Sequence, residues 1–481
     1  MMGQHTVEKI GGTSMSDYRS VRDNIIFKPT LANNMYQRIF VVSAYAGITD
    51  KLLEHKKTGD AGVFALFAQE RKQNNWFPAL QDVRNAMLAI NHSLFEVGEL
   101  RHKADAFLNS RLKEAQECLE DLHRLCQHGH FSISEHLATV REMLASLGEA
   151  HSAWNTAHLL QRDGVNAVFV DLTGWNSPSH MSLDERILDA FKDIDLSKEL
   201  PIATGYAHSE TGLMSTFDRG YSEMTFSRIA VLTKAHEAVI HKEFHLSSAD
   251  PRLVGESKAV PIGRTNYDVA DQLANLGMEA IHPKAAKGLR QSDISLRVKN
   301  TFEPEHTGTL ITGDYVSDAP CVEIIAGCRG VFAVELFDQD MAGDIDKFDV
   351  DILKVLRQFH AHIIAKDINA NTITHYLAIN LKTLKRVMRV LHERFADAEI
   401  TQRKVAIVSA IGSDMKTTGM LAKAVKAIAE QNVNVLAMHQ SMRQVDMQFV
   451  VDEEDYEKAI CSLHKELVEV HNHGRAICLA S

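Results

Sequence analysis

The chain has 481 residues, a length that suggests about two to four domains with sizeable buried cores. Hydrophobic residues make up 45% and charged residues 24%, as in soluble globular proteins, and the net charge of −11 argues against a broad nucleic-acid-binding face. The N-terminus, MMGQHTVEKI, lacks the apolar core of a signal peptide, and no apolar stretch approaches the roughly 20 residues that span a bilayer. The 6 cysteines form no CxxC pair, which fits a reducing compartment. We therefore expect a cytoplasmic protein that binds neither membranes nor nucleic acid.

The first predicted strand lies in VEKIGGTSM, residues 7–15, and ends in a glycine pair followed by two hydroxyl residues. Such a segment can be a tight turn, because glycine tolerates positive φ and Ser or Thr caps helices. It can also be a phosphate cradle, in which backbone N–H groups and a lysine face an anion. The segment alone leaves both interpretations open.

Strand-like and helical stretches alternate through the next part of the chain. RIFVVSAYAGIT (38–49) is rich in β-formers, whereas residues 61–161 have helical spacing and predict a helical insertion or hairpin. Strand-like runs return at 166–172 and 201–207, and again at 238–241 after a helix that we expect to begin near Thr225. This alternation predicts a mainly parallel sheet covered by helices, with ligands bound at the strand ends.

The pattern changes after TGTLITG (307–313). A strand (321–337), a helix (348–362), a strand–turn–strand (363–380) and a helix from residue 381 follow one another, and residues 404–467 repeat this order. Two units in βαββα order predict a duplicated α+β module of ferredoxin-like type. The final RAICLA (475–480) is also strand-like and could return to the sheet of the first module.

Several segments occur in an order that resembles one enzyme family. These are KIGGTS, VVSAYAGIT, SLGEAHSAW, TFDRGYSEMT and SSADPRLV within residues 9–254, then HPKAAKG (282–288) and GTLIT (308–312). Together they resemble the aspartate kinases of the amino-acid kinase superfamily, and HKEFHLSSADP with RTNYDVADQL resembles a divergent subgroup linked to ectoine synthesis.

The resemblance implies an α/β amino-acid kinase fold followed by two ACT-type modules. The expected boundaries are a catalytic domain at 1–315 with a helical insertion at about 60–148, and regulatory modules at 316–400 and 401–481. Paired modules of this kind imply a homodimer or larger homo-oligomer.

The implied reaction transfers a phosphoryl group from ATP to the side chain of L-aspartate, with Mg²⁺, giving 4-phospho-L-aspartate and ADP. This is the first step of aspartate-family amino-acid biosynthesis, with regulation by an amino-acid effector. The acceptor carboxylate has an ordinary pKa near 4 and needs no general base. The enzyme must instead align two anions and stabilise the transferring charge.

The resemblance also assigns roles to individual residues. The catalytic residues would be Lys9, Arg219 and Glu223. The substrate would be bound by Ser43, Thr49, Glu149, Arg219 and Ser222. The nucleotide would be bound by Lys9, Gly11, Gly12, Thr13, Ser14, Lys242, Asp250 and Arg252. Glu149 would face the substrate ammonium and Arg219 would clamp a carboxylate in bidentate fashion. Each of these roles has a simpler alternative when the family is set aside. Ser43 and Thr49 could cap a helix or close a turn. Glu149 could be a solvated glutamate on a helix face, and Arg219 could form a surface ion pair.

Two departures from the family pattern bear on activity. The family's GRGGSD is DRGYSE here, so Tyr221 replaces a glycine and Glu223 an aspartate. In HKEFHLSSADPR, His241 and Lys242 stand where the family has threonine and aspartate, and Ser247 stands at a tyrosine position. The alternatives are therefore an inactive amino-acid sensor, or a carboxylate kinase that acts on glutamate.

The remaining candidates concern metal ions and effectors. Histidines cluster near residues 123–130, 236–245 and 360–362, but none of these groups repeats a known zinc spacing, so we expect no structural metal site. Asp367, in AKDINANT, lies near an aspartate that the family uses for effector contact, although the neighbouring family pattern TTSE is absent.

Overall fold

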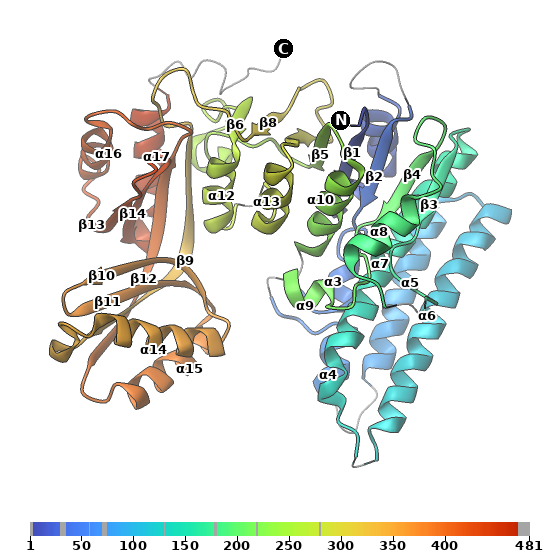
Figure 1. Cartoon of the computed structure of the whole chain (residues 1–481), viewed down its shortest axis with the longest axis horizontal. Helices are drawn as coiled ribbons and strands as arrows, with labels where there is room; N and C mark the ends of the chain where they lie inside the picture. Colours follow the sequence, from blue (N-terminus) through green and yellow to red (C-terminus); the bar gives the residue numbers. More distant parts are fainter. Residues whose placement is uncertain are drawn as a thin grey trace. The chain divides into compact units, whose positions relative to one another are not determined.

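The computed structural model describes residues 3–28, 35–56, 58–69, 75–128, 130–177, 180–217, 220–278 and 280–469. The chain forms two compact units (Figure 1). The first comprises the chain up to His245 together with Ile281–Gly313, and the second comprises Leu246–Ala280 and the chain from Asp314 onward. The catalytic segment that precedes the predicted boundary at residue 315 is therefore shared between the units. None of the helices in the described part of the chain combines the length and apolarity that a bilayer crossing requires.

A mainly parallel sheet forms the centre of the first unit, as the alternating pattern predicts. Its strands are β1 (Thr6–Ile10), β2 (Arg38–Val42), β3 (Ala167–Val170), β4 (Leu200–Thr204), β5 (Glu237–Lys242), β7 (Ser295–Asn300) and β8 (Thr309–Thr312). They are hydrogen-bonded in the order β3-β4-β2-β1-β5-β7-β8, and only β8 runs antiparallel to its neighbour. Every residue of β2 and β4 is buried, as expected for parallel strands covered on both faces.

Helices surround this sheet and extend beyond it. They are α1 (Gly12–Met15), α2 (Tyr18–Ser20), the π-helix η1 (Val21–Ile26), α3 (Ile48–Leu52), α4 (Val63–Gln69), α5 (Trp76–Leu94), α6 (Glu99–Leu125), the 3₁₀ turn η2 (Ile133–Glu135), α7 (Leu137–Arg162), α8 (Leu183–Phe191), α9 (Leu213–Phe217), α10 (Tyr221–Thr233) and α13 (Pro283–Gln291). Helix α10 begins at Tyr221, one turn before the position near Thr225 that we expected, because Gly220 ends the preceding loop.

The helical region predicted from residue spacing is formed by α4 to α7. In α6, the buried residues Ala104, Leu108, Leu112, Ala115 and Leu119 recur at intervals of three and four, which aligns them on one face. Helix α7 continues as one helix from this bundle to the sheet, where it packs against β3 and β4 (Figure 1). A single rigid element thus connects the helical extension to the strand ends.

The second unit contains the duplicated module, and its βαββα order is confirmed. The first copy is β9 (Ile324–Phe337), η4 (Gln339–Met341), α14 (Ile345–Gln358), β10 (His362–Asn369), β11 (Thr372–Ala378) and α15 (Leu381–Arg394). The second copy is β12 (Glu399–Ile411), α16 (Met420–Ala429), β13 (Val435–Gln440), β14 (Asp446–Asp452), η5 (Glu453–Asp455) and α17 (Tyr456–Leu467). This unit also holds α11 (Pro251–Val254), β6 (Arg264–Asn266) and α12 (Tyr267–Asn275).

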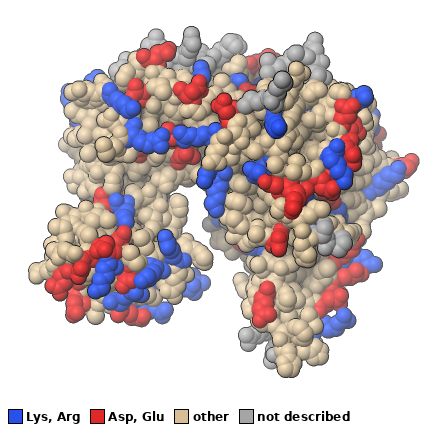
Figure 2. Space-filling model, viewed as in Figure 1, with Lys and Arg blue, Asp and Glu red and all other residues tan. Residues whose placement is uncertain are grey.

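The two copies share one antiparallel sheet, in the order β10-β11-β9-β12-β14-β13. The long central strands β9 and β12 pair from Ile324 with Ile411 to Phe337 with Glu399. Over α14 and α15, acidic and basic side chains lie side by side (Figure 2), and Asp351 pairs with Lys354 at 2.9 Å and with Arg394 at 3.0 Å. The predicted strand RAICLA lies outside the described residues.

A buried ionic cluster ties together three neighbouring strands of the first unit. Glu8 on β1 accepts hydrogen bonds from Arg38 on β2 at 2.6 and 3.0 Å, and lies 2.8 Å from the Nε2 atom of His241 on β5. All three residues are at most 6% exposed. Burial raises the pKa of Glu8, but the Arg38 charge and the bonds from His241 and Arg38 outweigh it and hold the pKa well below its usual range. Glu8 is therefore an ionised carboxylate inside the protein.

We expect Arg38→Met to lower the free energy of unfolding by about 3–5 kcal/mol, because it leaves the buried charge of Glu8 without its main partner. The 3 tryptophans, Trp76, Trp154 and Trp175, all lie in the first unit, so their fluorescence during urea unfolding reports on that unit. Arg124→Met is the matched control, because the Arg124 side chain is 77% exposed in its pair with Asp121. Equal urea midpoints for the two variants would contradict the role of the cluster.

Candidate active site

The carboxyl ends of β1, β2 and β4 lie at one edge of the parallel sheet. Ile10 pairs in register with Val42, and Val42 with Thr204, so the segments that follow all leave from this edge. In sheets of this kind, ligands bind at the carboxyl edge.

Lys9 and Glu223 form a buried ion pair at this edge. The Lys9 Nζ atom donates to Glu223 Oε1 at 3.1 Å, and the two side chains are 10% and 12% exposed. The other carboxylate oxygen of Glu223 accepts from the backbone N–H of His282. Burial raises the pKa of Glu223, but the charges of Lys9 and Lys242 and these hydrogen bonds outweigh it, so the pKa lies below its usual value. The extra methylene of Glu223 relative to the family's aspartate does not prevent contact with Lys9.

Glu149 lies on α7 within the same unit and contacts the start of α10. Its side chain is buried, and its Oε1 atom accepts from the Ser222 hydroxyl at 3.1 Å. Its Oε2 atom is also buried and has no hydrogen-bond partner among the described residues. Burial raises the pKa of Glu149 to about 8, against the opposing hydrogen bond from Ser222 and the charge of Lys9. A buried acceptor without a donor is a suitable position for a substrate cation.

Gly205 explains how Glu149 and Ser222 come this close. A Cβ atom at Gly205 would lie 2.8 Å from the Ser222 Cβ and 3.2 Å from the Glu149 Cδ. Sequence reasoning missed this glycine. Its signal was the TG pair within the predicted strand at 201–207.

The glycine pair of the first motif is a tight turn into a short helix. The Gly11 N–H donates to the His241 carbonyl at 3.1 Å, and a Cβ at Gly12 would lie only 2.7 Å from the Ala44 carbonyl oxygen. Thr13 is exposed, whereas the Ser14 hydroxyl is buried and lies 2.8 Å from the Thr301 hydroxyl. Neither glycine has a positive φ: Gly11 is extended, at a φ of −70°, and Gly12 begins α1. The close approach of Ala44, and not a left-handed turn, therefore requires the second glycine, and the first turn of α1 is compatible with anion binding by its backbone.

Ser43 and Thr49 belong to the segment that follows β2. The Ser43 N–H donates to the Ile10 carbonyl at 3.1 Å, and the Ser43 carbonyl accepts from the Ser152 hydroxyl at 2.9 Å. Thr49 is half-buried in α3, which begins after Gly47 at a φ of +79°. These contacts fix the backbone of both residues next to α7.

His241 and Lys242, the two departures at the end of β5, point to opposite faces of the sheet because side chains alternate along a strand. His241 joins the Glu8 cluster, and Lys242 lies on the face of Lys9, where its charge acts on Glu223. Asp250 and Arg252 belong to the second unit, where Asp250 caps α11 and pairs with Arg252 at 2.7 Å.

Arg219 and Asp367 are the remaining predicted site residues. Arg219 lies outside the described residues. Asp367, on β10, accepts from the Tyr376 hydroxyl at 2.7 Å, and its other oxygen lies 2.6 Å from His439 Nε2 on β13, in the second copy of the module. The candidate effector residue thus links the two copies. Within the described ranges, no group of three or more His, Cys, Asp or Glu side chains is arranged to hold a metal ion.

Comparisons with known proteins agree with this geometry. The amino acid kinase family model matches residues 4–300, and an ACT domain model matches residues 408–467. Aspartate kinase Ask_Ect from Stutzerimonas stutzeri is 56% identical over 99% of this chain and 100% of its own length, and its name agrees with the expected subgroup. The aspartokinase of Schizosaccharomyces pombe is 27% identical over 70% of this chain and 71% of its own length.

Solved structures show the same fold. E. coli aspartokinase III in complex with aspartate and ADP superposes with a TM-score of 0.72 at 21% identity, covering 96% of this chain and 100% of that one. The same enzyme in complex with lysine and aspartate gives a TM-score of 0.71, also at 21% identity, with 97% and 100% covered. The chain belongs to the amino acid kinase family and, within it, to the aspartate kinases.

Proposed function

We propose that this protein transfers the γ-phosphoryl group of ATP to the side-chain carboxylate of L-aspartate, giving 4-phospho-L-aspartate and ADP. The observation that carries this proposal is the pair of complementary groups at one sheet edge. A buried lysine is held there by an ionised carboxylate, and a second buried carboxylate has an unpartnered oxygen. The first suits a phosphoryl group and the second suits the ammonium of an amino acid.

Lys9 acts as a fixed cation. Its bond to Glu223 fixes the ammonium at the end of β1, and the charge of Lys242 adds to the positive potential on this face. The N–H groups of Gly12, Thr13 and Ser14, in the first turn of α1, approach the phosphate oxygens, whereas the Gly11 N–H is already bonded to the His241 carbonyl. Mg²⁺ enters as part of the MgATP substrate. This agrees with the contacts of Glu223, because both of its carboxylate oxygens already accept hydrogen bonds, one from Lys9 and one from His282.

The aspartate lies against α7 and the segment after β2. Glu149 pairs with the α-ammonium, Ser43, Thr49 and Ser222 bind polar groups of the substrate, and Arg219 clamps a carboxylate. The ionised acceptor carboxylate attacks the γ-phosphorus, the bond to the β–γ bridging oxygen breaks, and ADP leaves with that electron pair. No proton transfer is required.

Regulation and assembly follow from the second unit. We propose that an amino-acid effector binds the ACT modules near Asp367, and that these modules join copies of the chain in a homo-oligomer. Domain boundaries at residues 315 and 400, and a contribution of Lys242 to nucleotide binding, belong to the same proposal.

Hydroxylamine trapping of the acyl phosphate tests the reaction directly. We expect aspartate hydroxamate to form with MgATP and L-aspartate, and little product with L-glutamate or N-acetylglutamate, because Glu149 requires a free ammonium and the site is built for the shorter side chain. Absence of product at millimolar aspartate and ATP would favour a sensor. A higher kcat/KM with glutamate would favour the other kinase.

Lys9→Ala should lower kcat by about 10²–10³-fold, the usual effect of removing one group that stabilises developing charge. It should also destabilise the protein, because Glu223 stays buried without its hydrogen-bonded partner. The double variant Lys9→Ala/Glu223→Gln should recover stability but not activity, which separates catalysis from folding. Thermal unfolding and ADP release measure the two effects, and a wild-type kcat in Lys9→Ala would refute the assigned role.

Aspartate binding should release a proton near neutral pH. With its pKa raised to about 8, Glu149 is mostly protonated at pH 7 in the free protein, whereas an ammonium partner requires the carboxylate. The kcat/KM for aspartate should therefore rise with pH and level off above pH 8. Calorimetry in buffers of different ionisation enthalpy counts the released proton.

Glu149→Gln should abolish this proton release, flatten the pH profile and raise the KM for aspartate. The control is Glu120→Gln, at an exposed position on α6, which should keep the wild-type profile. A Glu149→Gln variant with an unchanged pH profile would remove Glu149 from the substrate site.

A further inference from the structure

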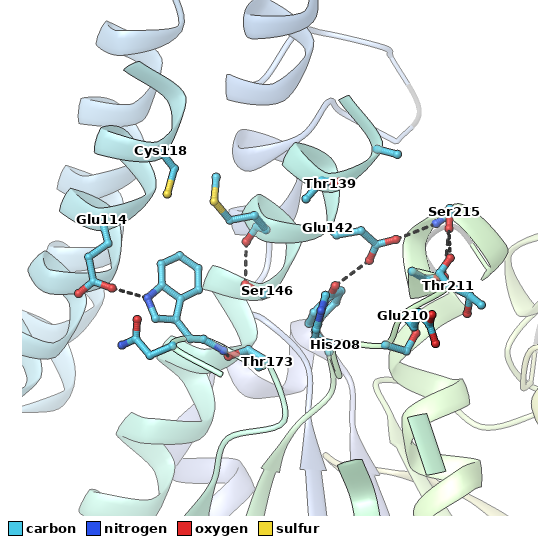
Figure 3. Close-up of a pocket in the computed structure, with 18 residues that line it drawn as sticks. Glu114, Cys118, Thr139, Glu142, Ser146, Thr173, His208, Glu210, Thr211 and Ser215 are labelled. Carbon is cyan, nitrogen blue, oxygen red and sulfur yellow. Dashed lines mark hydrogen bonds between the residues drawn. The ribbon is translucent and has the colours of Figure 1, made fainter. Parts of the chain in front are cut away.

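A cavity of about 420 Å³ lies in the first unit. Its walls are α6, α7, the turn that follows β3 and the segment that follows β4, and their side chains meet around it in Figure 3. None of the residues predicted to bind aspartate or the nucleotide lines it. Its volume is that of a pocket for a small organic molecule.

The cavity is acidic. Three glutamates line it, Glu114, Glu142 and Glu210, and its described lining contains no lysine or arginine. His208 also lines it, but burial and the charge of Arg186 lower the pKa of His208, so the imidazole is neutral at pH 7.

The carboxylates of the two opposite walls are bonded only to uncharged donors. Glu142 accepts from the Tyr206 hydroxyl at 2.7 Å and from the Ser215 N–H at 3.0 Å (Figure 3). Glu114 accepts from the Ser110 hydroxyl and the Trp175 indole N–H.

These bonds orient both carboxylates without neutralising them. Arg111, whose charge reaches Glu114, is itself paired with Asp171. The negative charge of the cavity is therefore not balanced by a cation in contact with Glu114 or Glu142 among the described residues.

A second observation points to a ligand. Ser209, which lines the cavity, is only 4% exposed, and its hydroxyl has no hydrogen-bond partner among the described residues. A buried hydroxyl without a partner costs free energy and calls for a donor or acceptor from outside the chain. Tyr206 and Trp175 add aromatic surface, which attracts organic cations, although the Arg111 guanidinium already lies over the Trp175 ring, 4.9 Å from its centroid.

We propose that this cavity binds a small organic cation that carries an ammonium or amidinium group. The glutamates supply the charge, the Ser209 hydroxyl accepts a hydrogen bond from the cation, and the aromatic side chains contact its carbon atoms. The proposal is independent of the kinase reaction, because it concerns binding at residues with no assigned role in that reaction.

Calorimetry and thermal unfolding of the full-length protein test it, with putrescine, agmatine and tetramethylammonium as probes. At least one probe should bind and raise the melting temperature, because a ligand that binds the folded state stabilises it. Sodium glutarate, a dianion of similar size, should not bind. Absence of binding by all three probes, or equal stabilisation by MgCl₂, would overturn the proposal.

Two sets of variants locate the site. Ala138→Trp places an indole at an exposed lining position of α7 and should abolish probe binding, whereas Ala106→Trp, at an exposed position of α6 outside the lining, should leave it intact. Glu114→Gln/Glu210→Gln should weaken binding about tenfold by removing two charges. Glu142 is left unchanged in these variants, because its hydrogen bonds from Tyr206 and Ser215 connect α7 to the segment that follows β4 and to α9. Equal affinity in the two tryptophan variants would place the cation elsewhere and refute the proposal.

Discussion

The contact between Lys9 and Glu223 is the constraint on which the candidate site depends. A lysine ammonium in a buried position loses hydration, and without a partner it would be destabilised or would release its proton. Glu223 prevents this with one oxygen, while its other oxygen accepts from the backbone of His282. The carboxylate thus connects the end of β1 to the starts of α10 and α13, so that one ion pair sets the relative position of three elements. The charge of Lys242 then leaves the group of three with a net positive charge, as a site for polyanions requires.

The strand that carries Lys9 is itself held from its other face. Side chains alternate along β1, so Glu8 and Lys9 point in opposite directions and serve different purposes. Glu8 is bonded to Arg38 and His241 from the strands on either side, which fixes the spacing of β2, β1 and β5. His241 completes an ionic cluster inside the protein, while its neighbour Lys242 faces the site.

Periodicity was sufficient to predict much of this fold, because both the parallel sheet and the duplicated module leave strong patterns of buried residues. The positions of β1 to β5, the helical stretch and the βαββα repeat follow from it. The failures have local causes. The start of α10 was placed near Thr225, although Tyr221 and Met224 are already buried in its first turn and Gly220 is its N-cap. The environment of Ser14 depends on Thr301, and that of Glu149 on Gly205 and Ser222, and such distant contacts have no counterpart in local spacing. The roles given to Lys9, Glu149 and Glu223 came from a family resemblance, since a lysine before a glycine turn does not indicate its own partner.

Helix α7 shows how one element can serve two sites. Glu142 and Glu149 lie seven residues apart, about two turns, so they project from nearly the same side of the helix. Glu142 accepts hydrogen bonds from two neutral donors, the Tyr206 hydroxyl and the Ser215 N–H, which hold its carboxylate in place. Glu149 has one hydroxyl partner and an unpartnered oxygen, and its pKa is raised to about 8. Burial is the main cause of the raised pKa of Glu149, and it outweighs the hydrogen bond from Ser222 and the charge of Lys9. A cation that pairs with Glu149 must therefore displace a proton.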